Sequence, residues 1–173
     1  MHWHTLLALC AASQSCDDNA SNALFQQALD RFTLDYYDVL QELAALPWHP
    51  RVLVNEYFVP ISAKPRCPPK LGLTEAKAQV LLARLSAFNA VLRTGARGFA
   101  FDAVQPSFVG HELCTPQPFV QGPNDAAPLH PNAAGELAIA LADEQALTKP
   151  RPALSAISTP AVSLSPSSGA HGP

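Results

Sequence analysis

The residues best suited to chemistry lie in the second half of the chain, in two segments rich in proline and glycine. The first runs from Asp102 to Cys114 and contains His111, and the second runs from Asn124 to Gly135 and contains His130. An imidazole titrates near neutral pH, so it can accept a proton from a hydroxyl and later return it. A short loop before a predicted helix would aim the His130 ring at the carboxyl edge of a sheet. We therefore predict that His130 is a general base, and we expect His111 to be a structural or surface residue.

No serine of the chain has the sequence setting of a nucleophile. Such a serine usually lies in a Gly-Asp-Ser or Gly-x-Ser-x-Gly segment, and neither segment occurs here. Ser107 is the least implausible candidate because it lies in the same loop region as His130, but we do not expect it to act as the nucleophile. His2 and His4 stand close together without a third ligand, so we predict no metal site and no cofactor.

Apolar periodicity and helix-breaking residues predict an alternating order of helices and strands. The predicted elements are a helix over Asn22–Leu46, a strand over Arg51–Val59, a helix from the N-cap Thr74 to about Arg93 with Gly95 as its stop, a strand over Gly98–Val104, and a helix from about Pro131 to Leu147. Asp17 and Asp18 are expected to cap the first helix. This order is typical of α/β proteins in which helices cover a parallel sheet. Two strands are too few for such a sheet, so we expect the chain to be part of a domain.

Two short motifs give the chain a family resemblance. They are the Phe-x-Gly-His-x-Leu-Cys segment that ends at Cys114 and the Leu-His-Pro-Asn-Ala-Ala-Gly segment that ends at Gly135. On these motifs, residues from about Trp3 to Leu147 resemble the C-terminal half of SGNH (GDSL-type) hydrolases. The resemblance implies a partial three-layer α/β/α, flavodoxin-like fold with a parallel sheet whose N-terminal strands are missing.

The same resemblance implies a serine ester hydrolase of the lipase or esterase type, acting on lipid or small acyl esters. His130 maps to the histidine that serves this family as base and acid. The family's nucleophilic serine and its oxyanion-hole glycine and asparagine have no counterpart here, so the chain is expected to be an inactive fragment. A truncated reading frame, a split gene or a wrongly chosen start would explain this. The alternative is a non-catalytic remnant or binding module that uses the residual cleft.

The group that orients the His130 ring is left open by the sequence. The family usually has an acid three residues before this histidine, and that position is Ala127 here. Asp125, five residues before His130, could reach the ring if the loop bulges. Alternatively, a backbone carbonyl around Ala127 accepts the ring N–H and fixes the tautomer.

The four cysteines are Cys10, Cys16, Cys67 and Cys114. They allow three pairings, and the sequential one joins Cys10 to Cys16 and Cys67 to Cys114. The other possibility is four unpaired thiols. Disulfides would indicate an oxidising compartment, so we expect the full-length form to be secreted or held in the cell envelope. The apolar segment Thr5–Ala12 does not look like a signal peptide, and the chain as written is expected to lack one.

The composition limits the kinds of partner that the chain is expected to bind. The net charge is −3 and no basic run stands out, which argues against nucleic acid. No apolar stretch is long enough for a membrane span. Residues 148–173 are rich in proline, serine and alanine, so we expect a disordered tail after a domain part over residues 1–147. The partner that remains is a small-molecule or lipid ester substrate.

Overall fold

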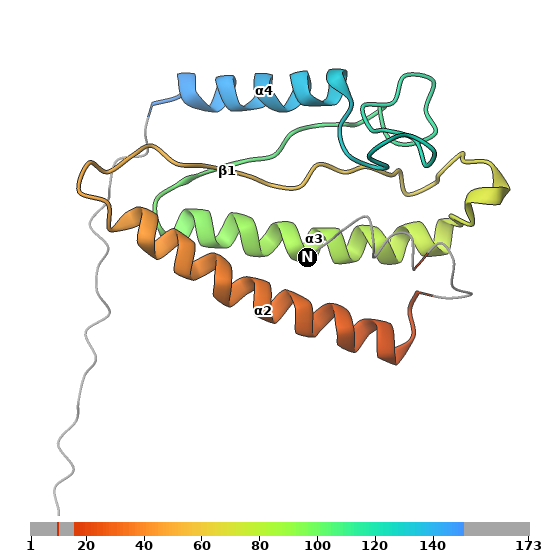
Figure 1. The fold of residues 1–173 in the computed structure, drawn as a ribbon, viewed down its shortest axis with the longest axis horizontal. Helices are drawn as coiled ribbons and strands as arrows, with labels where there is room; N and C mark the ends of the chain where they lie inside the picture. The colour runs from red at the N-terminus through yellow and green to blue at the C-terminus, as the bar shows by residue number, and fades with distance from the viewer. Residues whose placement is uncertain (1–9, 11–15, 151–173) are drawn as a thin grey trace, which may run out of the picture.

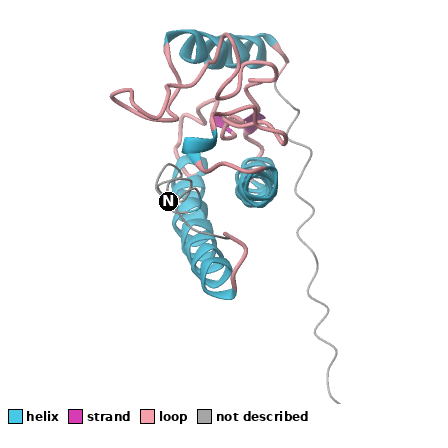
Figure 2. Ribbon diagram, turned by 90° about the vertical axis from the view of Figure 1, so that its right-hand side faces the viewer, coloured by secondary structure: helices cyan, strands magenta, loops and turns pink. Residues whose placement is uncertain are grey.

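The computed structural model describes residue 10 and residues 16–150 of the chain, and its elements alternate as the sequence predicts. They are α2 (Asn19–Ala44), β1 (Leu53–Asn55), the 3-10 helix η1 (Pro69–Leu71), α3 (Glu75–Gly98), β2 (Asp102–Val104) and α4 (Ala133–Thr148). Helix α4 lies on one side of the strands, and α2 and α3 lie on the other (Figures 1 and 2). The predicted fold class, α/β with a parallel sheet, is confirmed. None of the described helices combines the length and the apolar character that crossing a bilayer requires.

The two strands pair in parallel but are shorter than predicted. Leu53 lies opposite Asp102, and Asn55 lies opposite Val104. The predicted strand over Arg51–Val59 ends early because the next residue that would donate to β1, after Asp102 and Val104, is Pro106, which has no N–H. On the edge away from β2, the backbone of Tyr57 bonds instead to the amide of Asn89. Pairing therefore stops just beyond Asn55.

Helix α3 continues past the residue that was predicted to end it. Gly95 lies inside the helix and is buried. A Cβ at this position would lie 2.5 Å from the Tyr36 ring and 2.9 Å from the Leu40 side chain, so the glycine allows α2 to cross close to α3. The helix instead ends at Gly98, and β2 begins correspondingly late, at Asp102.

Each long helix begins at a side chain that caps its free N–H groups. Asp18 accepts from the backbone N–H of Ser21 and thereby caps α2, as predicted, and Thr74 accepts from Lys77 at the start of α3. The hydrogen bonds from Ser21 hold the pKa of the exposed Asp18 carboxyl below its usual value. Helix α4 is capped by Asn132, which accepts from Ala134 and Gly135.

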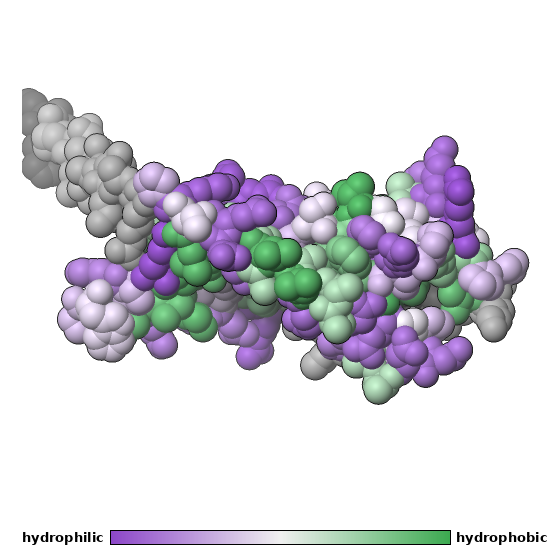
Figure 3. Space-filling view, turned by 90° about the horizontal axis from the view of Figure 1, so that it is seen from above, coloured by the Kyte–Doolittle hydropathy of each residue, from purple (hydrophilic) through white to green (hydrophobic). Residues whose placement is uncertain are grey.

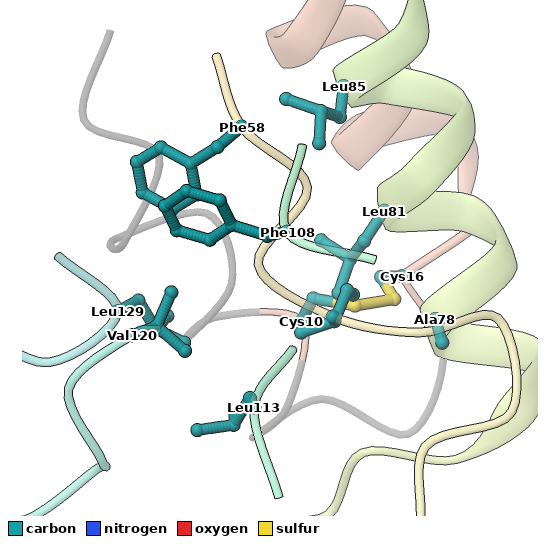
Figure 4. Close-up of a cluster of buried hydrophobic side chains, with 11 residues drawn as sticks. Cys10, Cys16, Phe58, Ala78, Leu81, Leu85, Phe108, Leu113, Val120 and Leu129 are labelled. Carbon is teal, nitrogen blue, oxygen red and sulfur yellow. A yellow bond between two sulfur atoms is a disulfide. The ribbon is translucent and has the colours of Figure 1, made fainter. Parts of the chain in front are cut away.

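The core lies between the strands, α3 and the loop that follows β2 (Figure 4). The rings of Phe58 and Phe108 stack with their centroids 4.4 Å apart. Leu81 and Leu85 of α3 are buried beneath them, and Val120 comes from the loop. This loop therefore contributes to the core as well as carrying the histidines.

Both disulfides follow the sequential pairing. Cys10 is joined to Cys16 and Cys67 to Cys114, so the possibility of four unpaired thiols is wrong. The Cys67–Cys114 bond ties the segment after β1 to the loop after β2.

Candidate active site

The loop over residues 105–132 leaves the carboxyl end of β2 and leads into α4. It lies at the end of the sheet where both parallel strands finish (Figure 1). Val120 and Pro131 form an isolated antiparallel bridge, and the N–H of Gln121 donates to the carbonyl of His130 at 2.8 Å. The main chain around His130 is therefore held by a neighbouring stretch of the same loop.

His130 stands on this loop with an exposed ring. Its Nδ1 lies 3.2 Å from the carbonyl oxygen of Pro128, and its backbone N–H donates to Ala127 at 3.1 Å. Leu129 adopts a φ of 65° and buries its side chain, so the residue before the histidine anchors the turn. If Nδ1 carries the proton toward Pro128, the neutral ring presents Nε2 as its proton acceptor.

Asp125, the alternative partner for the ring, has a well-defined role in the loop. Its Oδ2 accepts from the backbone N–H of Gly122 at 2.6 Å. This bond closes the turn over residues 122–125, in which the N–H of Asp125 also donates to the carbonyl of Gly122. A role for Asp125 beside His130 stays a prediction.

His111 is held as a structural residue would be. Its ring stacks on Phe119 with a centroid distance of 3.8 Å and an interplanar angle of 3°. Its Nδ1 lies 2.7 Å from the carbonyl oxygen of Gln117, and its own carbonyl accepts from Phe119. These contacts fit the predicted structural role and keep the ring parallel to a loop aromatic.

Asn132 and Gly135 position the loop, and sequence reasoning did not single them out. Besides capping α4, Asn132 donates from Nδ2 to the carbonyl of Pro118 at 2.6 Å. A Cβ at Gly135 would collide with the carbonyl oxygen of Phe119 and would meet the Phe108 ring at 3.2 Å. Asn132 thus fixes where the helix begins, and Gly135 lets the helix start lie against the loop. An asparagine directly before an alanine-rich run was the available signal.

The carboxylate that follows β1 is already engaged. Glu56 is 4% exposed, and both of its oxygens accept from Arg93. Hydrogen bonding to Glu56 raises the pKa of the Arg93 guanidinium. This ion pair stabilises the carboxyl end of β1, and the Glu56 carboxylate is therefore not a free acid for catalysis.

The remaining candidates do not assemble into a second site. Ser107 is exposed between the buried residues Pro106 and Phe108. Across residue 10 and residues 16–150, no three His, Cys, Asp or Glu side chains gather as metal ligands would. His2 and His4 lie outside the described residues, as does the tail beyond Pro150.

Comparison with known proteins defines the fold class. No family model matches the chain, and no curated protein sequence matches it. Among solved structures, the chain is similar to an extracellular lipase from Streptomyces rimosus, with a TM-score of 0.64 and 20% sequence identity. The match covers 80% of this chain and 63% of the lipase chain. The fold is therefore a lipase-like α/β fold, and this chain spans less than two thirds of that lipase.

Proposed function

We propose that this chain is the histidine-bearing part of a serine ester hydrolase of the SGNH type. The observation that carries the proposal is the place of His130, on an exposed turn at the carboxyl ends of two parallel strands, directly before the last helix. Open α/β sheets hold their sites at this edge. The lipase-like fold and the two motifs around His111 and His130 support the same class.

In this proposal His130 transfers protons for a serine that lies in a part of the fold outside this chain. Nε2 accepts the serine proton while the serine oxygen attacks the ester carbonyl, and it then protonates the departing alkoxide. Water then attacks the acyl-enzyme while the same histidine takes a proton from it. The histidine returns this proton to the serine oxygen, so the carboxylic acid is released and the serine is restored. The Pro128 carbonyl, as acceptor for Nδ1–H, keeps the ring oriented and stabilises its cation.

The chain by itself is expected to be inactive or nearly so, because it lacks the nucleophile. The substrates we propose are lipid or small acyl esters, with no cofactor required. The two disulfides require an oxidising environment, and the similar lipase is extracellular. We therefore propose that the full-length form is secreted or held in the cell envelope.

The test compares this chain with a form extended by the residues encoded upstream of Met1 in the same reading frame. Both are offered p-nitrophenyl acetate. We expect turnover in the extended form alone, and a loss of about 1000-fold or more in His130→Ala. The matched control is His49→Asn, since His49 occupies a turn after α2 with a φ of 42°, a conformation that asparagine tolerates.

Two outcomes would count against the proposal. Turnover that survives His130→Ala would show that another group is the base. A folded, inactive protein in both forms that binds a specific ligand would favour the alternative, a binding module without catalysis.

A further inference from the structure

One residue of the loop, Gln121, forms hydrogen bonds on both sides of His130. Its main-chain carbonyl accepts from the N–H of Leu129 at 3.0 Å, and its own N–H donates to the carbonyl of His130 at 2.8 Å. Its side-chain amide accepts from the N–H of Ala127 at 3.1 Å and donates to the carbonyl of Pro131 at 3.3 Å. A single half-buried residue therefore holds the turn that carries the histidine at both of its ends.

This turn has a conformation that its own sequence does not favour. The N–H of His130 closes it on the carbonyl of Ala127, with Pro128 second and Leu129 third at a φ of 65°. A positive φ at the third position is typical of type II β-turns, which usually have glycine or asparagine there. The Leu129 side chain is instead buried in the core beside Val120 (Figure 4). Such a strained conformation persists only where the surrounding structure holds it, so contacts outside the turn must stabilise it.

The orientation of one peptide unit links the turn to the histidine ring. The N–H of Leu129 and the carbonyl of Pro128 belong to the same trans peptide unit, so they point in opposite directions. The N–H is bonded to Gln121, and the carbonyl oxygen lies 3.2 Å from Nδ1 of His130. In a type I turn, which suits leucine better, this unit is turned over and its carbonyl would point away from the ring. The acceptor for Nδ1 therefore depends on what holds this peptide unit.

We propose that Gln121 is a positioning residue for His130, because its side-chain amide bridges the two ends of the turn and so keeps the Pro128 carbonyl at Nδ1. The bonds to Ala127 and Pro131 hold the Gln121 main chain alongside the turn, where its carbonyl fixes the peptide unit. Without the amide the unit turns over more readily, Nδ1 loses its acceptor, and the proton moves to Nε2 in a larger share of the rings. A ring in that form cannot accept a serine proton, so the catalytic part of this inference rests on the proposed function.

The test compares the full chain with its Gln121→Met variant, which keeps the length of the side chain and replaces the amide by a thioether. Long-range ¹H–¹⁵N correlation NMR measures the ratio of neutral His130 rings protonated at Nδ1 to those protonated at Nε2. We expect this ratio to shift about 2- to 10-fold toward Nε2, as the loss of one hydrogen bond would produce. Gln117→Met is the matched control, because Gln117 lies in the same loop and, among the described residues, only its main-chain carbonyl accepts a hydrogen bond.

Amide hydrogen exchange separates positioning from a general loosening of the loop. In Gln121→Met we expect exchange at Leu129 to become faster, while exchange at Asn132, whose N–H donates to the carbonyl of Phe119, stays nearly unchanged. An unchanged tautomer ratio in Gln121→Met, the same shift in Gln117→Met, or equal acceleration at Leu129 and Asn132 would overturn the proposal.

A second variant keeps the test decisive if Gln121→Met does not fold. Gln121→Glu retains an acceptor for Ala127 and loses the donor to Pro131, so its tautomer shift should be in the same direction and smaller than that of Gln121→Met. A Gln121→Glu variant with the tautomer ratio of the unchanged chain would contradict a bridge that needs both bonds.

Ester turnover in the upstream-extended form separates this inference from the proposed function. There Gln121→Met should lower kcat by about 2- to 10-fold with KM nearly unchanged, because the fraction of rings able to act as base falls while substrate binding does not. A tautomer shift without any turnover in the extended form would leave the positioning role intact and count against the proposed function. Turnover that His130→Ala abolishes, with no tautomer shift in Gln121→Met, would do the reverse.

Discussion

Helices α3 and α4 cover opposite faces of the same two-stranded sheet, yet they are buried to very different extents. Helix α3 buries a row of residues along its length, including Leu81, Arg84 and Asn89, and α2 covers it further. Arg84 also donates to the backbone of Cys16 and to Asn22, which ties α3 to the start of α2. Among the residues of α4, only Gly135 is buried.

The pattern of side chains on α4 explains the difference. The residues turned toward the strands and the loop are small or partly buried, as Gly135 and Ala138 are, whereas Leu137, Leu141 and Leu147 are exposed. Exposed leucines that are scattered singly are ordinary, but here three of them share one helix. Among the described residues, the α3 side of the sheet, called the complete face below, is covered by two helices (Figure 1), whereas the α4 side leaves apolar side chains exposed (Figure 3).

The largest expected effect is a core truncation on the complete face. Leu81→Ala removes a side chain with 0% exposure and should lower the free energy of unfolding by about 2–5 kcal/mol. Leu137→Ala on α4, at 60% exposure, should change it by less than about 0.5 kcal/mol. Urea unfolding of both variants measures the contrast. Similar losses at the two positions would contradict it.

The next effect concerns the point where α4 contacts the loop. Gly135→Ala should destabilise by about 1–3 kcal/mol, because the added Cβ meets the carbonyl oxygen of Phe119. Gly98→Ala is the matched control, since a Cβ there meets nothing within 4 Å. The control should be neutral or slightly stabilising. Thermal unfolding that ranks the two variants in the opposite order would show that α4 is not packed against the loop at Gly135.

A smaller effect should follow from releasing the far end of α4. The Arg51 guanidinium donates to the carbonyls of Ala146 and Leu147 and pairs with Asp102 at 2.9 Å. Arg51→Met keeps much of the apolar stem and should cost about 1–2 kcal/mol. Arg31→Met is the control, because within the described part of the chain Arg31 forms only a long, exposed ion pair with Asp35. If the free energy of unfolding changes negligibly in both variants, Arg51 does not anchor the end of α4.

Alkaline pH should weaken the contact between α2 and α3 through Tyr36. Burial raises the pKa of Tyr36, in the α2–α3 contact, from 10.0 to about 12. A folded pKa above the unfolded value gives stability that is present below pH 10 and lost as the pH rises toward 12. Tyr36→Phe should remove this part of the alkaline loss. An unchanged pH profile in the variant would show that Tyr36 is not its source.

The sequence predicted the order of elements and the fold class because apolar periodicity and caps such as Asp18 and Thr74 are local signals. It misplaced the end of α3, since Gly95 serves a contact with Tyr36 and Leu40 that lies far away in the sequence. It also made β1 too long, because the apolar run around Tyr57 does not reveal that the partner strand lacks a donor at Pro106. Both errors come from tertiary contacts that override local preference.

At the candidate site, the sequence indicated His130 through a motif and a helix start. For the acceptor beside Nδ1 the sequence left two possibilities open, Asp125 and a backbone carbonyl around Ala127. Which carbonyl lies there, that of Pro128, is defined only by the turn that Leu129 adopts with positive φ. The supporting residues Asn132 and Gly135 act through contacts with Pro118 and Phe119, which sequence spacing does not reveal.

The central claim is that His130 is held as a base whose Nδ1 carries the proton toward Pro128. Long-range ¹H–¹⁵N correlation NMR of the histidine rings, recorded on the full chain with the ring neutral, measures this tautomer directly. The claim predicts a protonated Nδ1 and an unprotonated Nε2 for His130, and His130→Ala assigns the signal. A His130 ring protonated at Nε2 would contradict it, because the nitrogen needed to accept the serine proton would already carry one.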